Sequence, residues 1–183
     1  MINKILIATF FCSIFFIDNI HAENIQYSKI KEGDIIFRKE DSFLSNRFEK
    51  MDGRGFSHIG IVYIKEKYPY VLHIERNDKK NDLKVVKIET FLNKSTKYKI
   101  KRLKGIYNTT NMTKKIKKIL LINPRFDFYF DLSTDNTLYC TELIYKLYKE
   151  TYGITLTTER SSFGFYTYIS VGSIVNSTYL QDI

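Results

Sequence analysis

The chain has 183 residues, which is enough for one domain with a substantial core and short for two. A hydrophobic content of 44% and an aromatic content of 15% exclude a disordered chain. The formal net charge is +9, but Lys, Asn and Ile are frequent along the whole sequence. We therefore interpret the charge as a compositional bias and expect no nucleic-acid partner.

The first 22 residues have the layout of a secretory signal peptide. Lys4 gives a positive start, residues 5–17 form a nearly unbroken apolar run, and Ala22 is a small residue at the expected cleavage point. The run is too short to span a bilayer comfortably. We expect an exported protein, periplasmic or secreted, with a single mature domain over residues 23–183. Its charge stays +9, because residues 1–22 contain one Lys and one Asp.

The mature chain predicts strands in the middle with helices outside, which is an α+β pattern. Pro124 and Gly153 are expected to end two of the helices. The aromatic tail from Ser161 is short of charge and is expected to pack back onto the body. We predict strands at 35–37, 56–64, 70–75, 85–88 and 98–103, and helices at 41–51, 113–122 and 139–152.

Two of the predicted strands form a hairpin around the loop Lys65–Tyr68. If Ile64 faces Pro69, the numbers of opposed residues sum to 133, and His58 then faces Glu75. Opposed residues in an antiparallel pair have Cβ atoms about 5 Å apart, so an imidazole and a carboxylate there are within hydrogen-bonding reach. The pattern predicts a base, His58, with Glu75 as the group that orients it.

The other face of this hairpin is wholly apolar, which supports the same register. A slip by one residue would place the carboxylate of Glu75 among apolar side chains, at a cost of several kcal/mol. His73 shares the face of His58 and is an alternative orienting residue. The expected core face carries Ile59, Ile61 and Tyr63 opposite Ile74, Leu72 and Tyr70.

Cys140 is the candidate nucleophile. The sequence has two cysteines, and because Cys12 lies in the signal, the mature chain carries one thiol and no possible internal disulfide. Cys140 stands where a helix is predicted to begin, and the dipole and free N–H groups of a helix start favour a thiolate. Those N–H groups also provide part of a possible oxyanion hole.

Each candidate has a structural alternative. Cys140 is then a buried structural thiol, His58 a core histidine with satisfied hydrogen bonds, and Glu75 a surface carboxylate paired with Arg76 or a lysine. Histidine, cysteine and glutamate also suggest zinc, but their spacing lacks a close ligand pair, so we expect no metal and no cofactor.

Five short motifs together resemble a known family. Their order, with the histidine before the cysteine, is similar to that of the permuted papain-like amidases of the YiiX/YaeF type, which are relatives of NlpC-type cell-wall peptidases. The resemblance covers about residues 30–150 and implies a permuted papain-like fold with a central antiparallel sheet. It places the nucleophile on Cys140, the base on His58 and the polar third member on Glu75. The motifs are Gly33-Asp34-Ile35-Ile36-Phe37, Ser57-His58-Ile59-Gly60-Ile61-Val62, His73-Ile74-Glu75, Phe126-Asp127-Phe128 and Tyr139-Cys140-Thr141-Glu142-Leu143.

Several positions depart from the family pattern. Thr141 stands where Ser is frequent, Arg76 where a small residue is usual, and Phe126 where Tyr precedes Asp127. Asp127 is a candidate cleft residue, with the capping of a turn as its alternative role. Further candidates for the cleft or the oxyanion hole are Tyr139, Ser57 and His73.

The resemblance implies a cysteine amidase or peptidase that acts through a thioester acyl-enzyme, with small peptides or cell-wall peptides as substrates. One alternative is a lipid-ester hydrolase or acyltransferase on the same fold. The aromatic tail and the basic charge would suit that activity, with an anionic lipid or membrane surface as partner. Another alternative is a catalytically inactive binding module.

Overall fold

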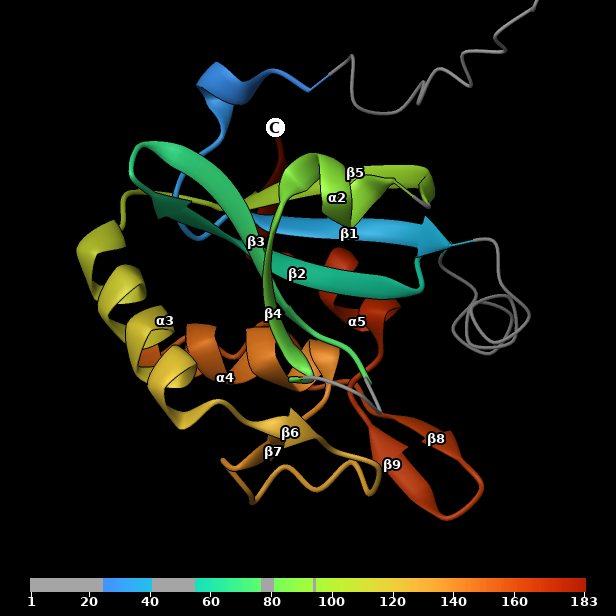
Figure 1. The fold of residues 1–183 in the computed structure, drawn as a ribbon. Helices are drawn as coiled ribbons and strands as arrows, with labels where there is room; N and C mark the ends of the chain where they lie inside the picture. Colours follow the sequence, from blue (N-terminus) through green and yellow to red (C-terminus); the bar gives the residue numbers. More distant parts are fainter. Residues whose placement is uncertain (1–24, 41–54, 77–80, 94) are drawn as a thin grey trace, which may run out of the picture.

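The computed structural model describes residues 25–40, 55–76, 81–93 and 95–183. Within these ranges a six-stranded sheet has the order β10-β5-β1-β2-β3-β4, and every neighbouring pair is antiparallel (Figure 1). This confirms the expected central antiparallel sheet. The strands are β1 (Ile35–Glu40), β2 (His58–Lys65), β3 (Tyr68–Ile74), β4 (Leu83–Lys87), β5 (Ser95–Leu103) and β10 (Leu180–Asp182).

Helices cover both faces of this sheet. Figure 1 shows α3, α4 and α5 on one face and α2 on the other. Two small sheets flank the helical side: β6 (Arg125–Phe126) runs parallel to β7 (Thr137–Leu138), and β8 (Ser161–Phe163) pairs with β9 (Tyr166–Tyr168) in a projecting hairpin. The helices are η1 (Tyr27–Lys29), α2 (Ile88–Leu92), α3 (Thr109–Ile122), α4 (Cys140–Tyr152) and α5 (Val171–Val175).

The predicted hairpin register is correct where the two strands are paired. Tyr63 faces Tyr70 and Ile61 faces Leu72, so the numbers again sum to 133. The turn is tighter than expected, because β2 and β3 run on to Lys65 and Tyr68 and leave two residues between them, both with positive φ. Positive φ at both positions is the geometry of the turn that matches the twist of a hairpin.

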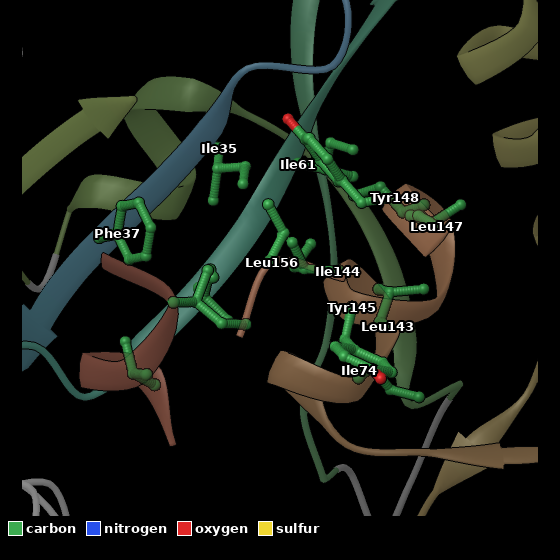
Figure 2. Close-up of a cluster of buried hydrophobic side chains, with 14 of the residues drawn as sticks. Ile35, Phe37, Ile61, Ile74, Leu143, Ile144, Tyr145, Leu147, Tyr148 and Leu156 are labelled. Atoms are coloured by element: carbon green, nitrogen blue, oxygen red, sulfur yellow. The ribbon is translucent and has the colours of Figure 1, made fainter. Parts of the chain in front are cut away.

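The alternation of side chains across the sheet creates two cores. The larger lies between the sheet and helices α3, α4 and α5, and Figure 2 shows Ile61 and Ile74 of the hairpin facing Leu143, Ile144 and Leu147 of α4. The expected apolar face of the hairpin is therefore the face that α4 covers. The smaller core lies on the opposite face, where α2 packs; it consists of Ile25, Ile36, Val71, Ile88, Phe91, Leu92 and Ile100.

Some local predictions need correction. Helix α3 begins at Thr109, four residues before the predicted start, because the side chain of Asn108 accepts a hydrogen bond from the N–H of Thr110 and caps it. The strand predicted to include Ile88 ends at Lys87, and Ile88 instead starts the short helix α2. A five-residue helix carries too little periodicity to be recognised in a sequence.

The tail packs back only in part. Ile169, Ile174 and Leu180 are buried in the larger core, whereas Phe163 and Phe165 of the β8–β9 hairpin are exposed. The signal peptide and the helix predicted at 41–51 lie outside the described residues. Among the helices that the structure describes, none has both the length and the apolar character needed to cross a bilayer.

Candidate active site

Cys140 is the first residue of α4, one residue after the predicted start of the helix, and the side chains of its two neighbours bind the main chain of Ile169. The hydroxyl of Thr141 donates to the carbonyl of Ile169 at 2.5 Å, and the N–H of Ile169 donates to the hydroxyl of Tyr139 at 3.0 Å. The residues before and after the cysteine are thus both hydrogen-bonded to Ile169, which lies between β9 and α5. Sequence reasoning missed Ile169, because a backbone anchor leaves no side-chain signal.

The thiol of Cys140 is not activated in the way that the sequence predicts. Burial raises the pKa of the Cys140 thiol to about 12. The N–H groups of Thr141 and of Cys140 itself, together with the charge of Arg38, act in the opposite direction but do not overcome this effect. The start of the helix therefore stabilises a thiolate, as expected, yet the resting sulfur is a thiol.

His58 opens β2 and is 8% exposed. Its Nε2 lies 2.9 Å from Nδ1 of His73, and its ring stacks on Phe91 of α2 at a centroid distance of 5.7 Å. Burial lowers the pKa of His58 well below its usual value, and the nearby charge of Arg38 lowers it further. The imidazole is accordingly neutral and able to accept a proton.

The hydrogen bond expected between His58 and Glu75 is not the one observed. Glu75 follows the last residue of β3, and its carboxylate accepts a hydrogen bond from Lys84 Nζ of β4 at 3.0 Å and lies 3.8 Å from Arg38. Burial alone would raise the pKa of Glu75, but the hydrogen bond from Lys84 and the two cations bring it below its usual value. The carboxylate of Glu75 pairs with cations because β4 places the ammonium group of Lys84 beside it. The ring of His58 is hydrogen-bonded to His73 instead.

His73 is therefore the hydrogen-bond partner of His58, the role that the hairpin register predicted for Glu75 and for which His73 was the alternative. It is 2% exposed, and burial together with the charge of Arg38 lowers its pKa to about 3. Its ring also meets Phe91 edge-on at a centroid distance of 5.1 Å. The two imidazoles and the phenyl ring form one buried cluster on the α2 face of the sheet.

One cavity brings most of the predicted residues together. It has a volume of about 330 Å³ and is lined by Cys140, His58 and Glu75, as well as by Ser57 and Tyr139. The α2 cluster and the start of α4 lie on opposite faces of the sheet. His58 is the member of the cluster that lines this cavity, and His73 and Phe91 do not line it. The remaining lining is largely apolar: Phe56, Ile74, Phe126, Phe130, Thr141, Tyr168, Ile169, Ser170 and Val171, with Glu40 and Arg76.

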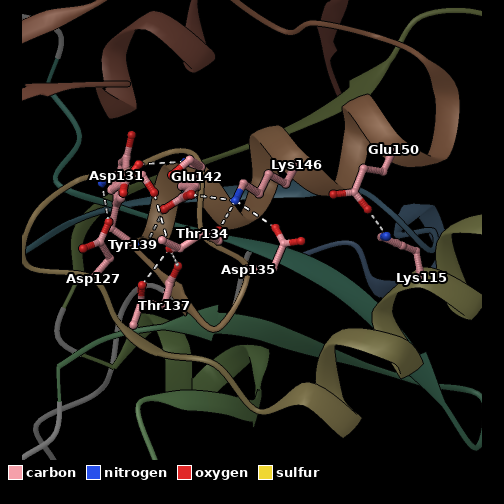
Figure 3. A network of polar contacts seen from close by, with 11 residues as sticks. Lys115, Asp127, Asp131, Thr134, Asp135, Thr137, Tyr139, Glu142, Lys146 and Glu150 are labelled. Atoms are coloured by element: carbon pink, nitrogen blue, oxygen red, sulfur yellow. Dashed lines mark hydrogen bonds and ion pairs between the residues drawn. The ribbon is translucent and has the colours of Figure 1, made fainter.

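Asp127 caps a turn, which is the alternative role considered for it. Its two carboxylate oxygens accept hydrogen bonds from the N–H groups of Tyr129 at 2.7 Å and Asp131 at 2.6 Å. The side chain is buried and does not line the cavity described above. Figure 3 shows Asp127 close to Asp131 and Tyr139, in the loop that leads to Cys140.

A buried ion pair supports the first turn of α4 (Figure 3). Glu142 is fully buried, lies 3.0 Å from Lys146 Nζ, and accepts a hydrogen bond from the N–H of Tyr139 at 3.3 Å. Lys146 also contacts Asp135 and the carbonyl of Thr134. Burial raises the pKa of Glu142 to about 7, although Lys146 opposes the shift. The polar position two residues after the cysteine was the available signal for this contact.

In the part of the chain that the structure describes, no group of three His, Cys, Asp or Glu side chains is placed to hold a metal ion. The cavity brings a thiol, a neutral imidazole and the start of a helix together.

A cysteine at the start of a helix that packs on an antiparallel sheet, with the candidate histidine earlier in the chain, defines a papain-like arrangement in permuted order. The model of the permuted papain-like amidase enzymes, the YaeF/YiiX family, matches residues 29–176, and the chain belongs to this family.

A relative in sequence supports this assignment, and a solved structure shares the fold. The chain is 30% identical over 124 residues to the uncharacterized protein YiiX of Escherichia coli (strain K12); the match covers 67% of this chain and 59% of that protein, which is less than two thirds of its length. The fold is similar to a crystal structure titled metalloprotein yiiX from Escherichia coli O157:H7. That likeness has a TM-score of 0.69 at 19% identity and covers 84% of this chain and 96% of the other.

Proposed function

We propose that this protein is an exported cysteine amidase or peptidase, with Cys140 as nucleophile and His58 as base. The observation that carries the proposal is the cavity that Cys140 and His58 both line. Membership of a family of permuted papain-like amidase enzymes supports an amide bond as the target. For the third member of the triad we favour His73 over Glu75, because His73 is the residue hydrogen-bonded to the ring of His58.

The reaction starts from a neutral pair. Because burial raises the pKa of the thiol and lowers that of His58, a thiolate and an imidazolium do not form in the resting site. His58 takes the thiol proton as the sulfur attacks the carbonyl carbon and the carbonyl electron pair moves to oxygen. The imidazolium then returns the proton to the leaving amine. Water, activated by the same imidazole, hydrolyses the thioester and frees the acid.

The start of α4 supplies the charge stabilisation for these steps. The N–H groups of Cys140 and Thr141 already act on the sulfur. Preorganised N–H donors at the point where negative charge develops account for a large part of the rate in acyl transfer. The contacts of Tyr139 and Thr141 with Ile169 hold these donors in place.

For the substrate we propose small peptides or cell-wall peptides, reached after export through the signal at residues 1–22. The apolar run behind Lys4 and the small residue Ala22 support export. A second candidate activity, cleavage or transfer of a lipid acyl ester, is favoured by the aromatic lining of the cavity. In that case Phe130 and Tyr168 would contact an acyl chain.

Turnover by the wild type and by Cys140→Ala on two substrates tests the proposal. We expect the wild type to release new amino groups from purified peptidoglycan fragments, and we expect Cys140→Ala to release none. Activity on phospholipid vesicles alone would overturn the amidase assignment in favour of the lipid activity. Activity that survives in Cys140→Ala but is lost in EDTA would overturn the cysteine mechanism.

A further inference from the structure

Arg38, which the sequence analysis did not identify as a candidate, is a buried charged residue beside the imidazole pair. Arg38 pairs with His58 in the β1–β2 register, and its side chain is 7% exposed. Burying a cation costs several kcal/mol unless its partners compensate. A buried arginine next to candidate catalytic histidines therefore requires an explanation beyond packing.

Arg38 is fixed by contacts with α2 and with two carboxylates. Its Nη1 donates to the carbonyl of Phe91 at 2.5 Å, and its guanidinium carbon lies 4.3 Å from the centroid of the Phe91 ring. Its Nη2 pairs with Glu40 and lies 3.8 Å from Glu75. Glu40 and Glu75 both line the cavity that contains Cys140.

The Phe91 ring connects this cation to the histidines. One phenyl ring stacks on His58, meets His73 edge-on and lies under the guanidinium of Arg38. Arg38 contacts both the carbonyl and the ring of Phe91, and it therefore fixes the ring that the two imidazoles contact. We propose that Arg38 is a positioning residue of the active site, which holds the His58–His73 pair through Phe91 and holds the carboxylates of Glu40 and Glu75 at the cavity.

The charge of Arg38 has a second consequence for the pair. The groups that act on the imidazoles are Arg38 from β1, Lys84 from β4 and Glu75 after β3. Arg38 lowers the pKa of both histidines, while Glu75 raises that of His73. Arg38 also acts across the sheet on Cys140, whose pKa it lowers. The same cation thus favours a neutral base and a more acidic thiol.

The test is an NMR titration of the histidine side chains in Arg38→Met and Arg38→Lys. The three histidines of the chain are assigned by single substitutions. We expect the pKa values of His58 and His73 to rise in Arg38→Met and to stay close to wild type in Arg38→Lys. Because the proposal rests on the proposed function, turnover is measured as well. We expect kcat to fall about ten- to a hundred-fold in Arg38→Met with KM little changed.

Arg102→Met is the matched control. Arg102 on β5 also binds a buried carboxylate, that of Asp34, at 2.7 Å, but it lies away from the cavity. This control is expected to lose stability without a change in histidine titration or kcat. If Arg38→Met lowers the melting temperature but leaves both histidine titrations and kcat at their wild-type values, Arg38 is structural and the proposal is wrong.

Phe91→Leu keeps the experiment decisive if Arg38→Met does not fold. It retains the cation and removes the ring that both imidazoles contact. We expect the shared imidazole N–H signal of the His58–His73 hydrogen bond to weaken and kcat to fall. Unchanged signals and kcat would overturn the proposal. The NMR measurements need no substrate, so they remain informative even if the proposed amidase activity fails.

Discussion

The two halves of the candidate site lie on opposite faces of one sheet and are held in different ways. On the α4 face, main-chain contacts with Ile169 and a buried ion pair position Cys140. On the α2 face, side chains hold His58, namely the His73 ring, the Phe91 ring and the Arg38 guanidinium. The nucleophile is thus positioned through side chains of its neighbours in the chain, Tyr139, Thr141 and Glu142. The base is positioned by contacts that its own ring makes.

The largest effect that separates the two halves is expected at the orienting residue. His73→Ala removes the hydrogen-bond partner of His58, so we expect kcat to fall about a hundred-fold or more. Glu75→Gln loses part of an ion pair with Lys84 and is expected to lower kcat less than about ten-fold. Steady-state kinetics of both variants check this order. The reverse order would restore Glu75 as the third member of the triad.

A smaller effect is expected from the anchor of the nucleophile. Thr141→Val keeps the shape of the side chain but leaves the buried carbonyl of Ile169 without its hydroxyl donor. We expect a loss of about 1–3 kcal/mol in the free energy of unfolding, measured by urea denaturation. The conservative Thr141→Ser, which retains the hydroxyl, serves as control. Equal stability of Val and Ser variants would show that this contact does not hold the start of α4.

The two halves should also differ in the pH dependence of stability, where their contributions have opposite signs. Burial raises the pKa of Glu142 from 4.5 to about 7. The folded state then binds more protons, so this group lowers stability as pH rises from about 4.5 to 7. The pKa of His73 is lowered from 6.5 to about 3, so the unfolded state binds more protons and stability falls as pH drops below about 6.5.

Glu142→Gln and His73→Gln separate these two contributions. Unfolding free energies measured between pH 4 and 8 should lose the decline towards pH 7 in Glu142→Gln. The decline towards acid pH should weaken in His73→Gln. If Glu142→Gln keeps the wild-type decline in stability between pH 4.5 and 7, Glu142 does not have the raised pKa that its burial implies. If His73→Gln keeps the wild-type decline below pH 6.5, His73 does not have the lowered pKa that its burial implies.

The features that could be predicted from the sequence are those that depend on the local pattern of apolar and polar residues. The hairpin register follows from the alternation of Ile59 and Ile61 with His58 and Gly60, and the start of α4 at Cys140 follows from its apolar spacing. Family resemblance added the order of histidine and cysteine. These features needed no knowledge of distant contacts.

The features of the site that the sequence did not predict depend on contacts between distant residues, which the periodicity of the sequence does not encode. The register placed Glu75 opposite His58, but Lys84 on the next strand draws the carboxylate away. The contribution of Arg38 needed α2, a helix too short to predict, and the anchoring of Thr141 needed a backbone group 28 residues later. The raised pKa of the thiol likewise comes from tertiary burial, which outweighs the helix start.

The central claim is that His58 serves as the base for Cys140 although the two arise from opposite faces of the sheet. The most direct measurement is the burst of acyl-enzyme on Cys140, followed by mass spectrometry after mixing with an activated peptide ester, in wild type and His58→Gln. We predict a burst in the wild type whose rate falls about a hundred- to ten-thousand-fold in His58→Gln, with both proteins folded. Equal acylation rates in the two proteins would contradict the account.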